Sequence, residues 1–197
     1  MRWYRVLMAA AVLAAIGYDY WRVSVQFNQT AGNYLSYFTI QGNLLAAAVL
    51  AWGAIRPTPS SATRAILRGA AVLYLLVTGI VYGVLLSGLE YSVVPLVDTI
   101  LHRVSPVVLA LDWLIDRPGR AITLRRATLW LAYPLVYLAY TLLRGLATGW
   151  YPYPFLNPGR VGGYDVVAAW CGALALGIVA LAGLVLLVGR NARRVEP

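Results

Sequence analysis

Six long apolar runs divide this chain, and they constrain its fold more than any other feature. Each run approaches the ~20 residues that a helix needs to cross about 30 Å of hydrocarbon. Hydrophobic residues make up 61% of the chain and charged residues only 12%, which is unlike a soluble domain. The sequence therefore predicts an all-α, polytopic membrane protein with one domain over residues 1–197. Its six transmembrane helices are expected at about 3–21, 35–55, 66–87, 97–115, 127–148 and 164–189.

The arginines predict the orientation of these helices. All sixteen basic residues are arginine, and twelve of them flank the runs on the side that holds both chain termini. The twelve are Arg2, Arg5, Arg56, Arg64, Arg68, Arg117, Arg120, Arg125, Arg126, Arg190, Arg193 and Arg194. Only Arg22 and Arg160 fall on the other side, so the positive-inside rule predicts cytoplasmic termini. Because the arginines sit in short loops, the net charge of +9 does not indicate a nucleic-acid partner.

Residue types that are rare or missing exclude several cofactors. Without lysine, the chain cannot be a retinal protein or a Schiff-base aldolase. Its one histidine, His102, excludes bis-histidine haem within a protomer, and its one cysteine, Cys171, excludes a disulfide framework. Asp98 and His102 offer two metal ligands without an evident third. We therefore expect neither a cofactor nor a metal.

The histidine lies in an apolar segment, DTILHRVSPVVLALDW, at residues 98–113. At about 100° per residue, one helical stripe roughly 80° wide collects its polar side chains. The stripe holds Asp98, His102, Ser105, Leu109 and Asp112. Ionisable groups at membrane depth are costly, so this face is expected to line a bundle interior or a wet cavity, as a functional site does. The alternative is that Asp98 and His102, spaced i and i+4, satisfy one another and pin the helix.

A second polar pair, Thr39 and Asn43, opens the run SYFTIQGNLLAAAVL. The same face carries the small residues Gly42, Ala46 and Ala47, which allow close packing and point the pair into the bundle. The helices of Thr39 and His102 should run in the same direction, which places both residues roughly 6–8 Å deep at 1.5 Å per residue. A hydroxyl becomes a nucleophile when an oriented base takes its proton, and Thr39, His102 and Asp98 can fill these roles. Equally, Thr39 can bond its own helix backbone while Asn43 bridges two helices.

Two further stripes and one loop extend the polar lining. The helix expected at 127–148 carries Tyr133, Tyr137, Tyr140 and Arg144 at spacings of four, three and four, and the helix at 66–87 carries Tyr74, Thr78 and Tyr82. A buried Arg144 needs an anionic partner, which could be Asp98, Asp19 or a substrate carboxylate. The loop GWYPYPFLNPGR is stiff and amphipathic, suited either to an interfacial belt or to capping a cavity.

Three motifs carry a family resemblance: YFTIQGNLL, LHRVSPVVLALDWL and YPLVYLAYTLLRGLATGWYPYPFLNP. In this order they resemble a bacterial group of six-helix membrane proteins that is similar to the androgen-induced protein and the androgen-dependent TFPI-regulating protein. The resemblance spans about residues 5–185 and implies a bacterial inner membrane. The animal members are integral membrane threonine hydrolases that cleave fatty acid esters of hydroxy fatty acids. Their threonine lies early in the second helix and their histidine in the fourth, which match Thr39 and His102 here.

Together these observations predict a membrane-embedded ester hydrolase acting on a fatty acyl ester. Thr39 is the expected nucleophile and His102 its base, with Asp98 as support. Asn43 is expected to stabilise the oxyanion and Arg144 to hold a carboxylate or headgroup. The candidates for the substrate cavity are Tyr82, Ser105, Tyr137 and Tyr140. The alternative is a non-catalytic lipid- or small-molecule-binding protein, or a transporter, that uses the same polar cavity; the oligomeric state stays open.

Overall fold

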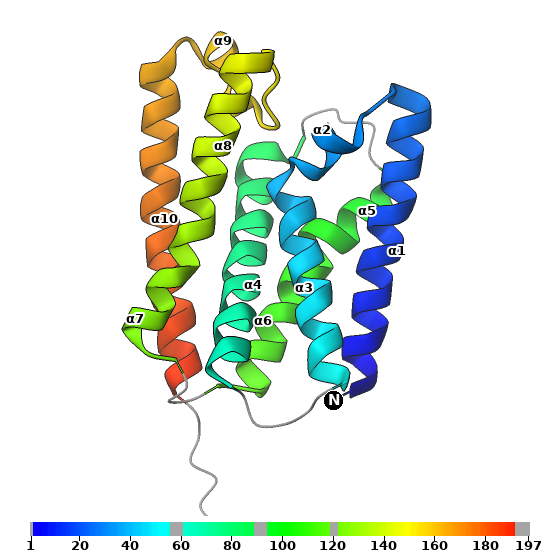
Figure 1. Cartoon of the computed structure of the whole chain (residues 1–197), viewed down its shortest axis with the longest axis vertical. Helices are drawn as coiled ribbons and strands as arrows, with labels where there is room; N and C mark the ends of the chain where they lie inside the picture. The colour runs from blue at the N-terminus through cyan, green and yellow to red at the C-terminus, as the bar shows by residue number, and fades with distance from the viewer. Residues whose placement is uncertain (1, 56–60, 89–93, 119–121, 192–197) are drawn as a thin grey trace, which may run out of the picture.

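The computed structural model describes residues 2–55, 61–88, 94–118 and 122–191, and within them the fold is all-α. Five long helices lie side by side along the long axis of one bundle (Figure 1). They are α1 (Arg2–Phe27), α3 (Phe38–Ile55), α4 (Ala62–Val81), α8 (Ala132–Thr148) and α10 (Tyr164–Arg190). The shorter helices are α2 (Ala31–Leu35), α5 (Pro95–Thr99), α6 (Ser105–Ile115), α7 (Leu124–Ala127) and α9 (Pro158–Val161).

Five helical stretches in this part of the chain are long and apolar enough to cross a membrane. They are Arg2–Phe27, Phe38–Ile55, Ala62–Leu86, Leu124–Thr148 and Tyr164–Arg190. The outward faces of α8 and α10 expose large apolar side chains such as Leu143 and Leu176, which are 67% and 75% exposed. Apolar faces of this length suit a lipid environment, because each helix satisfies its own backbone hydrogen bonds. The chain thus has the features of a polytopic membrane protein.

The fourth predicted helix, 97–115, is not one continuous α-helix. It begins at Pro95 as α5, passes through a π turn, η2 (Ile100–Val104), and continues as α6. A second π turn, η1 (Tyr82–Leu86), ends the stretch that starts with α4. The other predicted bounds shift by a few residues: α1 continues to Phe27, and α3 begins only at Phe38 because α2 and a turn precede it.

Both ends of the described chain lie at the same end of the bundle. Figure 1 shows α1 beginning and α10 ending there, with α7 beside them, whereas α2 and α9 lie at the opposite end. We call the first the arginine end and the second the cavity end. Of the twelve flanking arginines, Arg56, Arg120, Arg193 and Arg194 lie outside the described residues. Of the remaining arginines of that set, Arg117 follows α6, and the others belong to helices that start or finish at the arginine end.

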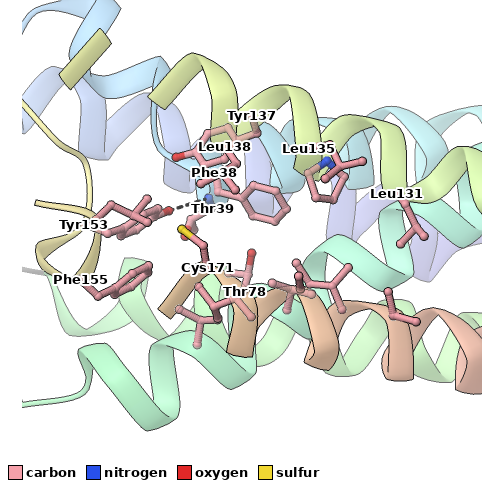
Figure 2. A pocket seen from close by; sticks show the side chains of 18 of the residues that line it. Phe38, Thr39, Thr78, Leu131, Leu135, Tyr137, Leu138, Tyr153, Phe155 and Cys171 are labelled. Atoms are coloured by element: carbon pink, nitrogen blue, oxygen red, sulfur yellow. Dashed lines mark hydrogen bonds between the residues drawn. The ribbon is translucent and has the colours of Figure 1, made fainter. Parts of the chain in front are cut away.

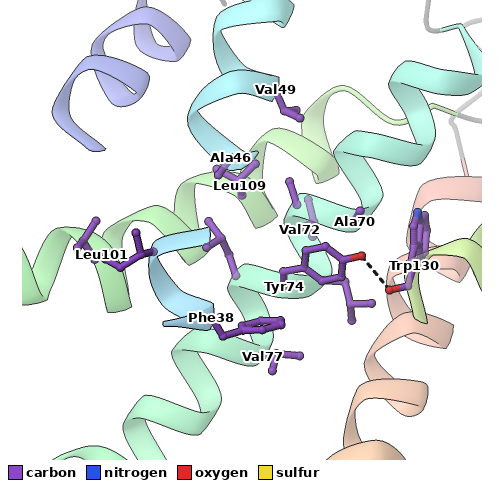
Figure 3. Close-up of a cluster of buried hydrophobic side chains, with 14 of the residues drawn as sticks. Phe38, Ala46, Val49, Ala70, Val72, Tyr74, Val77, Leu101, Leu109 and Trp130 are labelled. Atoms are coloured by element: carbon purple, nitrogen blue, oxygen red, sulfur yellow. Dashed lines mark hydrogen bonds between the residues drawn. The ribbon is translucent and has the colours of Figure 1, made fainter. Parts of the chain in front are cut away.

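The centre of the bundle is packed with aromatic and aliphatic side chains (Figure 3). Trp130 is fully buried against α4, where its indole N–H donates to the Ile66 carbonyl at 2.8 Å. Gly69 makes this contact possible, since a Cβ there would collide with the Trp130 ring. Tyr74 donates its hydroxyl hydrogen to the Trp130 carbonyl at 2.9 Å. Small residues and satisfied aromatic donors therefore hold α4 against the start of α8.

A buried charge cluster, defined here as Arg5, Arg68, Asp112 and Asp116, joins three helices at the arginine end. Arg5 Nε lies 2.6 Å from Asp112 Oδ1, and Arg5 Nη2 lies 2.7 Å from Asp116 Oδ2. Arg68 Nη2 lies 2.7 Å from Asp112 Oδ2 and also donates to the Asp112 carbonyl. Tyr4 hydrogen bonds to the same Asp112 carboxylate. Asp112 of α6 is thus paired with arginines of α1 and α4, as burial of its charge requires, and the half-buried Asp116, which follows α6, pairs with the same arginines.

Candidate functional site

Two cavities meet at Thr39 near the cavity end of the bundle. The apolar cavity, of about 260 Å³, is lined by side chains such as Phe38, Thr78, Leu138, Phe155 and Cys171. The polar cavity, of about 390 Å³, is lined by side chains such as Asp19, Arg22, Tyr82, Asp98 and His102. Thr39, Leu86 and Tyr153 line both. The predicted nucleophile therefore stands on a wall with an apolar space on one side and ionisable groups on the other.

Thr39 is the second residue of α3 and is 8% exposed. At this position a helix amide has no partner in its own first turn. The Thr39 N–H instead donates to the Tyr153 hydroxyl oxygen at 3.4 Å, a long contact drawn in Figure 2. The same figure shows Tyr153 and Phe155 at one end of the apolar cavity and Leu131 at the other. The start of α3 is therefore joined to the aromatic loop that follows α8.

His102, Asp98 and Tyr82 form one interlocked group on the wall of the polar cavity. His102 Nδ1 lies 2.9 Å from Asp98 Oδ1, and the Tyr82 hydroxyl donates to Asp98 Oδ2 at 2.7 Å. The Tyr82 ring stacks on the imidazole, with centroids 4.0 Å apart and planes 15° apart. The hydrogen bond of Nδ1 is to the Asp98 backbone carbonyl at 3.3 Å, so the favoured tautomer carries its hydrogen on Nδ1 and leaves the Nε2 lone pair available. Both the pinning and the functional interpretation of the Asp98–His102 spacing are compatible with this geometry.

Pro106 explains why His102 lies in a π turn. In the π turn, the Ser105 N–H bonds the Ile100 carbonyl rather than that of Leu101. The next amide along the chain belongs to Pro106, which has no N–H to offer the Leu101 carbonyl. Asn43 Nδ2 donates to that carbonyl at 3.0 Å, whereas Ser105 Oγ lies 3.2 Å from it but gives its one hydroxyl hydrogen to Asn43 Oδ1 at 2.6 Å. A side chain thus replaces the missing backbone donor, and π turns of this kind often mark functional sites.

Asn43 is fully buried and its amide group is fully engaged. Nδ2 donates to the Thr39 carbonyl at 2.9 Å as well as to Leu101, while Oδ1 accepts from Ser105 Oγ at 2.6 Å. Ser105, a predicted cavity candidate, is itself completely buried. An oxyanion role for Asn43 stays a prediction that would require one of these donors to leave its carbonyl. In this structure Asn43 bridges α3 to the π turn, which is the alternative that its sequence position left open.

The predicted stripe on α8 forms a ladder of hydrogen bonds along α2 and α3. Tyr133 bonds Gln41, Tyr137 donates to the Ser36 carbonyl at 2.9 Å, and Tyr140 pairs with Ser36 Oγ at 2.7 Å. Tyr137 also lines the apolar cavity, whereas Tyr140 lines neither cavity. The stripe therefore docks α8 more than it lines a polar space, because each hydroxyl finds a partner across the helix interface.

Arg144 pairs with neither of the two aspartates that the sequence offered as partners, Asp98 and Asp19. Asp19 lies 3.4 Å from Arg22, and Asp98 pairs with His102, so neither reaches Arg144. Arg144 Nη2 instead donates to Asn33 Oδ1 at 2.5 Å, and its guanidinium lies 4.5 Å from the Trp150 ring centroid. The reason is that α8 packs against α2 at this level. Among the described residues, Arg144 has no carboxylate partner, and its buried Nη1 has no hydrogen-bond acceptor.

The segment after α8 folds back beneath the start of α3. Gly149 ends α8 with a φ of 70°, in the left-handed region that glycine adopts without strain. Pro152 and Pro154 then flank Tyr153 and fix its backbone. The Tyr153 ring stacks on Phe155 with centroids 5.4 Å apart and planes 2° apart. Of the two functions that the loop composition allowed, capping a cavity fits this placement, since Tyr153 lines both cavities.

Sequence reasoning missed three residues of this site: Arg22, Leu86 and Tyr153. Arg22 is 7% exposed and lines the polar cavity beside Asp19. The i,i+3 spacing of Asp19 and Arg22 was a usable signal, whereas nothing local indicated that Tyr153 would reach Thr39. Within the described residues, no three His, Cys, Asp or Glu side chains gather as metal ligands.

No family model, no curated protein and no solved structure matches this chain. The resemblance carried by the three motifs therefore stays an expectation, and the functional argument depends on the geometry of the site.

Proposed function

We propose that the chain crosses the membrane six times, with α5, η2 and α6 forming the fourth span and both termini in the cytoplasm. Residues 95–115 form an unbroken helical path that would extend about 30 Å at ~1.5 Å per residue. The positive-inside rule, applied to twelve arginines against two, supports the orientation, and the resemblance supports a bacterial inner membrane. Reporters fused near Thr123 or after Pro197 should behave as cytoplasmic, and one near Asn157 as external. An external signal from the C-terminal fusion would contradict this topology.

We propose that the protein is a membrane ester hydrolase in which Thr39 is the nucleophile and His102 the general base. The observation that carries the proposal is the position of Thr39 on the wall shared by the two cavities, one of which His102 lines. An ester of a fatty acid divides into an apolar acyl chain and an alcohol part on either side of its carbonyl. The acyl chain fits the apolar cavity and the alcohol part the polar cavity, so the carbonyl falls beside Thr39.

The reaction has two halves. His102 Nε2 takes the proton of Thr39 Oγ1, which bonds to the carbonyl carbon while the carbonyl π pair moves to its oxygen. The tetrahedral intermediate collapses, its bond to the alcohol oxygen breaks, and that oxygen takes the proton from His102. Water then attacks the acyl-threonine, giving its proton to His102. The bond to Thr39 Oγ1 breaks, Oγ1 regains the proton, and a carboxylic acid leaves.

Asp98 and Tyr82 act as positioning residues in this mechanism. Asp98 holds the Nδ1 side of the imidazole, with its backbone carbonyl at 3.3 Å and its carboxylate at 2.9 Å, which selects the tautomer that leaves Nε2 as a base. Tyr82 fixes Asp98 by a hydrogen bond of 2.7 Å and covers one face of the imidazole. Both residues lie in or beside π turns, where the helix backbone departs from its regular register. The contacts of these two residues support the proposed role of His102 as an oriented base.

A second candidate function is non-catalytic binding or transport of a lipid or small molecule in the same cavities. The observation that favours it is that, within the described residues, no hydrogen bond joins the Thr39 hydroxyl to His102. Catalytic hydrogen bonds are often long or absent before substrate binds, so this observation does not weigh against hydrolysis. It does give the binding proposal a structural basis.

A covalent probe separates the two candidate functions. The purified full-length protein in detergent should hydrolyse p-nitrophenyl esters of fatty acids, and a fluorophosphonate should label it at Thr39, as mass spectrometry of the labelled peptide would report. Thr39→Ala should be unlabelled and inactive, and Thr39→Ser, which keeps the hydroxyl, should retain partial activity. Folded native protein that cleaves no ester and takes no label would support the binding function. Full turnover by Thr39→Ala would remove the mechanism.

A further inference from the structure

We propose that the Tyr153 hydroxyl is a catalytic group that donates a hydrogen bond to the oxyanion formed at Thr39. The inference depends on the hydrolase function proposed above and deepens it. It assigns to the aromatic loop after α8 the role that the sequence assigned to Asn43.

The tetrahedral intermediate needs a donor that Asn43 does not supply. Negative charge that develops on the carbonyl oxygen in an apolar site requires hydrogen-bond donors aimed at it. Asn43 has two amide hydrogens, and both donate to backbone carbonyls, of Thr39 at 2.9 Å and of Leu101 at 3.0 Å. Withdrawing either would leave the carbonyl of a buried residue with one partner fewer, at a cost in free energy. Another group beside Thr39 must therefore supply the hydrogen bond to the oxyanion.

Tyr153 is the polar side chain that the fold places against Thr39 on the wall of both cavities. Its hydroxyl oxygen lies 3.4 Å from the Thr39 amide nitrogen, and the ring is 9% exposed. Leu86, the third residue on that wall, has no hydrogen to donate. A carbonyl carbon within bonding reach of Thr39 Oγ1 therefore brings its oxygen close to the Tyr153 hydroxyl.

The Tyr153 ring is held in place before substrate binds. Phe155 stacks on one face at 5.4 Å, and Tyr37 meets it edge-on with centroids 5.9 Å apart. Pro152 and Pro154 restrict the backbone on both sides. Oxyanion donors are effective because they are fixed before the charge develops, so that nothing need reorganise during the reaction. A stacked tyrosine between two prolines meets that requirement.

The chemistry of the hydroxyl also fits a donor. Burial raises the pKa of Tyr153 to about 12, and hydrogen bonds to Thr39 oppose that shift. The phenol therefore stays protonated at neutral pH and keeps the hydrogen that an oxyanion accepts. The Thr39 N–H, by donating to the phenol oxygen, polarises the O–H bond and strengthens its donation.

Tyr153→Phe tests the inference, because it keeps the stacked ring and removes only the hydroxyl. With p-nitrophenyl decanoate as substrate, kcat should fall about 10²–10³-fold, as when one oxyanion donor is lost, while KM stays unchanged. The rate constant of fluorophosphonate labelling at Thr39 should fall with it. The matched control is Tyr151→Phe, which removes a hydroxyl two residues away that lines neither cavity, and should keep native kcat.

Other readouts separate this role from a structural one. Para-aminophenylalanine at position 153 keeps a donor at the same place and should restore part of kcat. If Tyr153→Phe fails to fold, para-fluorophenylalanine at position 153 decides, because it keeps a para substituent but has no hydrogen to donate: a lowered kcat with native KM supports the role, and native kcat overturns it. A Tyr153→Phe protein with native kcat, or with changes in KM alone, also overturns the inference while leaving the hydrolase function intact. Native protein that cleaves no ester would instead remove the hydrolase function itself.

Discussion

The two ends of the bundle bury ionisable groups in opposite ways. In the charge cluster at the arginine end, Asp112 accepts from Arg5 and Arg68, so that each buried charge faces an opposite one. Neither cavity is lined by a member of that cluster. At the cavity end, Asp98 and His102 also contact one another, yet both border an open space of about 390 Å³. The charge cluster joins helices and lines neither cavity, which indicates a role in stability. The Asp98–His102 pair borders a cavity and leaves one face of the imidazole for a ligand.

Substituting the proposed nucleophile and its base should produce the largest loss of kcat/KM. That loss would assign catalysis to the cavity end of the bundle and not to the arginine end. Thr39→Ala and His102→Ala should each lower kcat/KM at least about 10⁴-fold, and the double variant should be no worse than either, since the two act as one unit. Ester turnover by all three variants, with melting temperature as the control for folding, provides the measurement. Losses that multiply in the double variant would mean that the residues act independently.

Asp98→Asn should be the next largest change. An amide can present an N–H where the carboxylate faces Nδ1, so the imidazole would be held in the wrong tautomer. We expect kcat to fall by about 10³–10⁴-fold while the protein stays folded. Tyr82→Phe, which removes only the hydroxyl that holds Asp98, should cost much less. A native pH–rate profile and kcat in Asp98→Asn would show that the pair only pins the helix.

Asp112→Ala should lower the free energy of unfolding and leave the rate of ester hydrolysis unchanged. It leaves Asp116 as the one remaining carboxylate of the cluster for both Arg5 and Arg68, at a cost of about 3–5 kcal/mol. Unfolding by SDS in mixed micelles measures this free energy, and Asp165→Ala, an exposed acidic residue of α10, should stay within about 0.5 kcal/mol of native. Activity per folded molecule should be unchanged. Native stability for Asp112→Ala would mean that the charge cluster is dispensable.

Arg144→Gln should have the smallest effect, confined to one class of substrate. Arg144 lines neither cavity, but it has a neutral amide partner and no carboxylate among the described residues, so we predict that it can hold a substrate acid. KM should rise about tenfold, or ~1.4 kcal/mol, for esters that carry a free carboxylate and stay native for neutral esters. Arg160→Gln, at an exposed site, serves as the control. Equal changes for both substrate types would assign Arg144 to docking α8 on α2, and a selective effect of Arg22→Gln would transfer the role to Arg22.

Hydropathy predicted most of the fold, because it is a local property that each long helix carries in its own residues. The Asp98–His102 contact was predictable for the same reason, since i,i+4 neighbours share a helix face. The partners of Arg144 and Tyr153 were not, because Asn33 and Thr39 are brought to them by the folding of distant segments. The π turn escaped prediction as well: it needs both a proline at 106 and the Asn43 side chain of another helix.

That π turn has a consequence for how one helix serves two neighbours. A π turn contains one residue more than an α turn, so the stretch from α5 to α6 is equivalent to a regular helix with a single insertion. The insertion rotates everything after it by about 100° relative to the part before. A variant with one residue deleted from the π turn would keep either Asp112 directed at the arginines or His102 directed at the cavity. It would not keep both. The extra residue therefore lets His102 and Asp112 face different directions around the axis of this one helix.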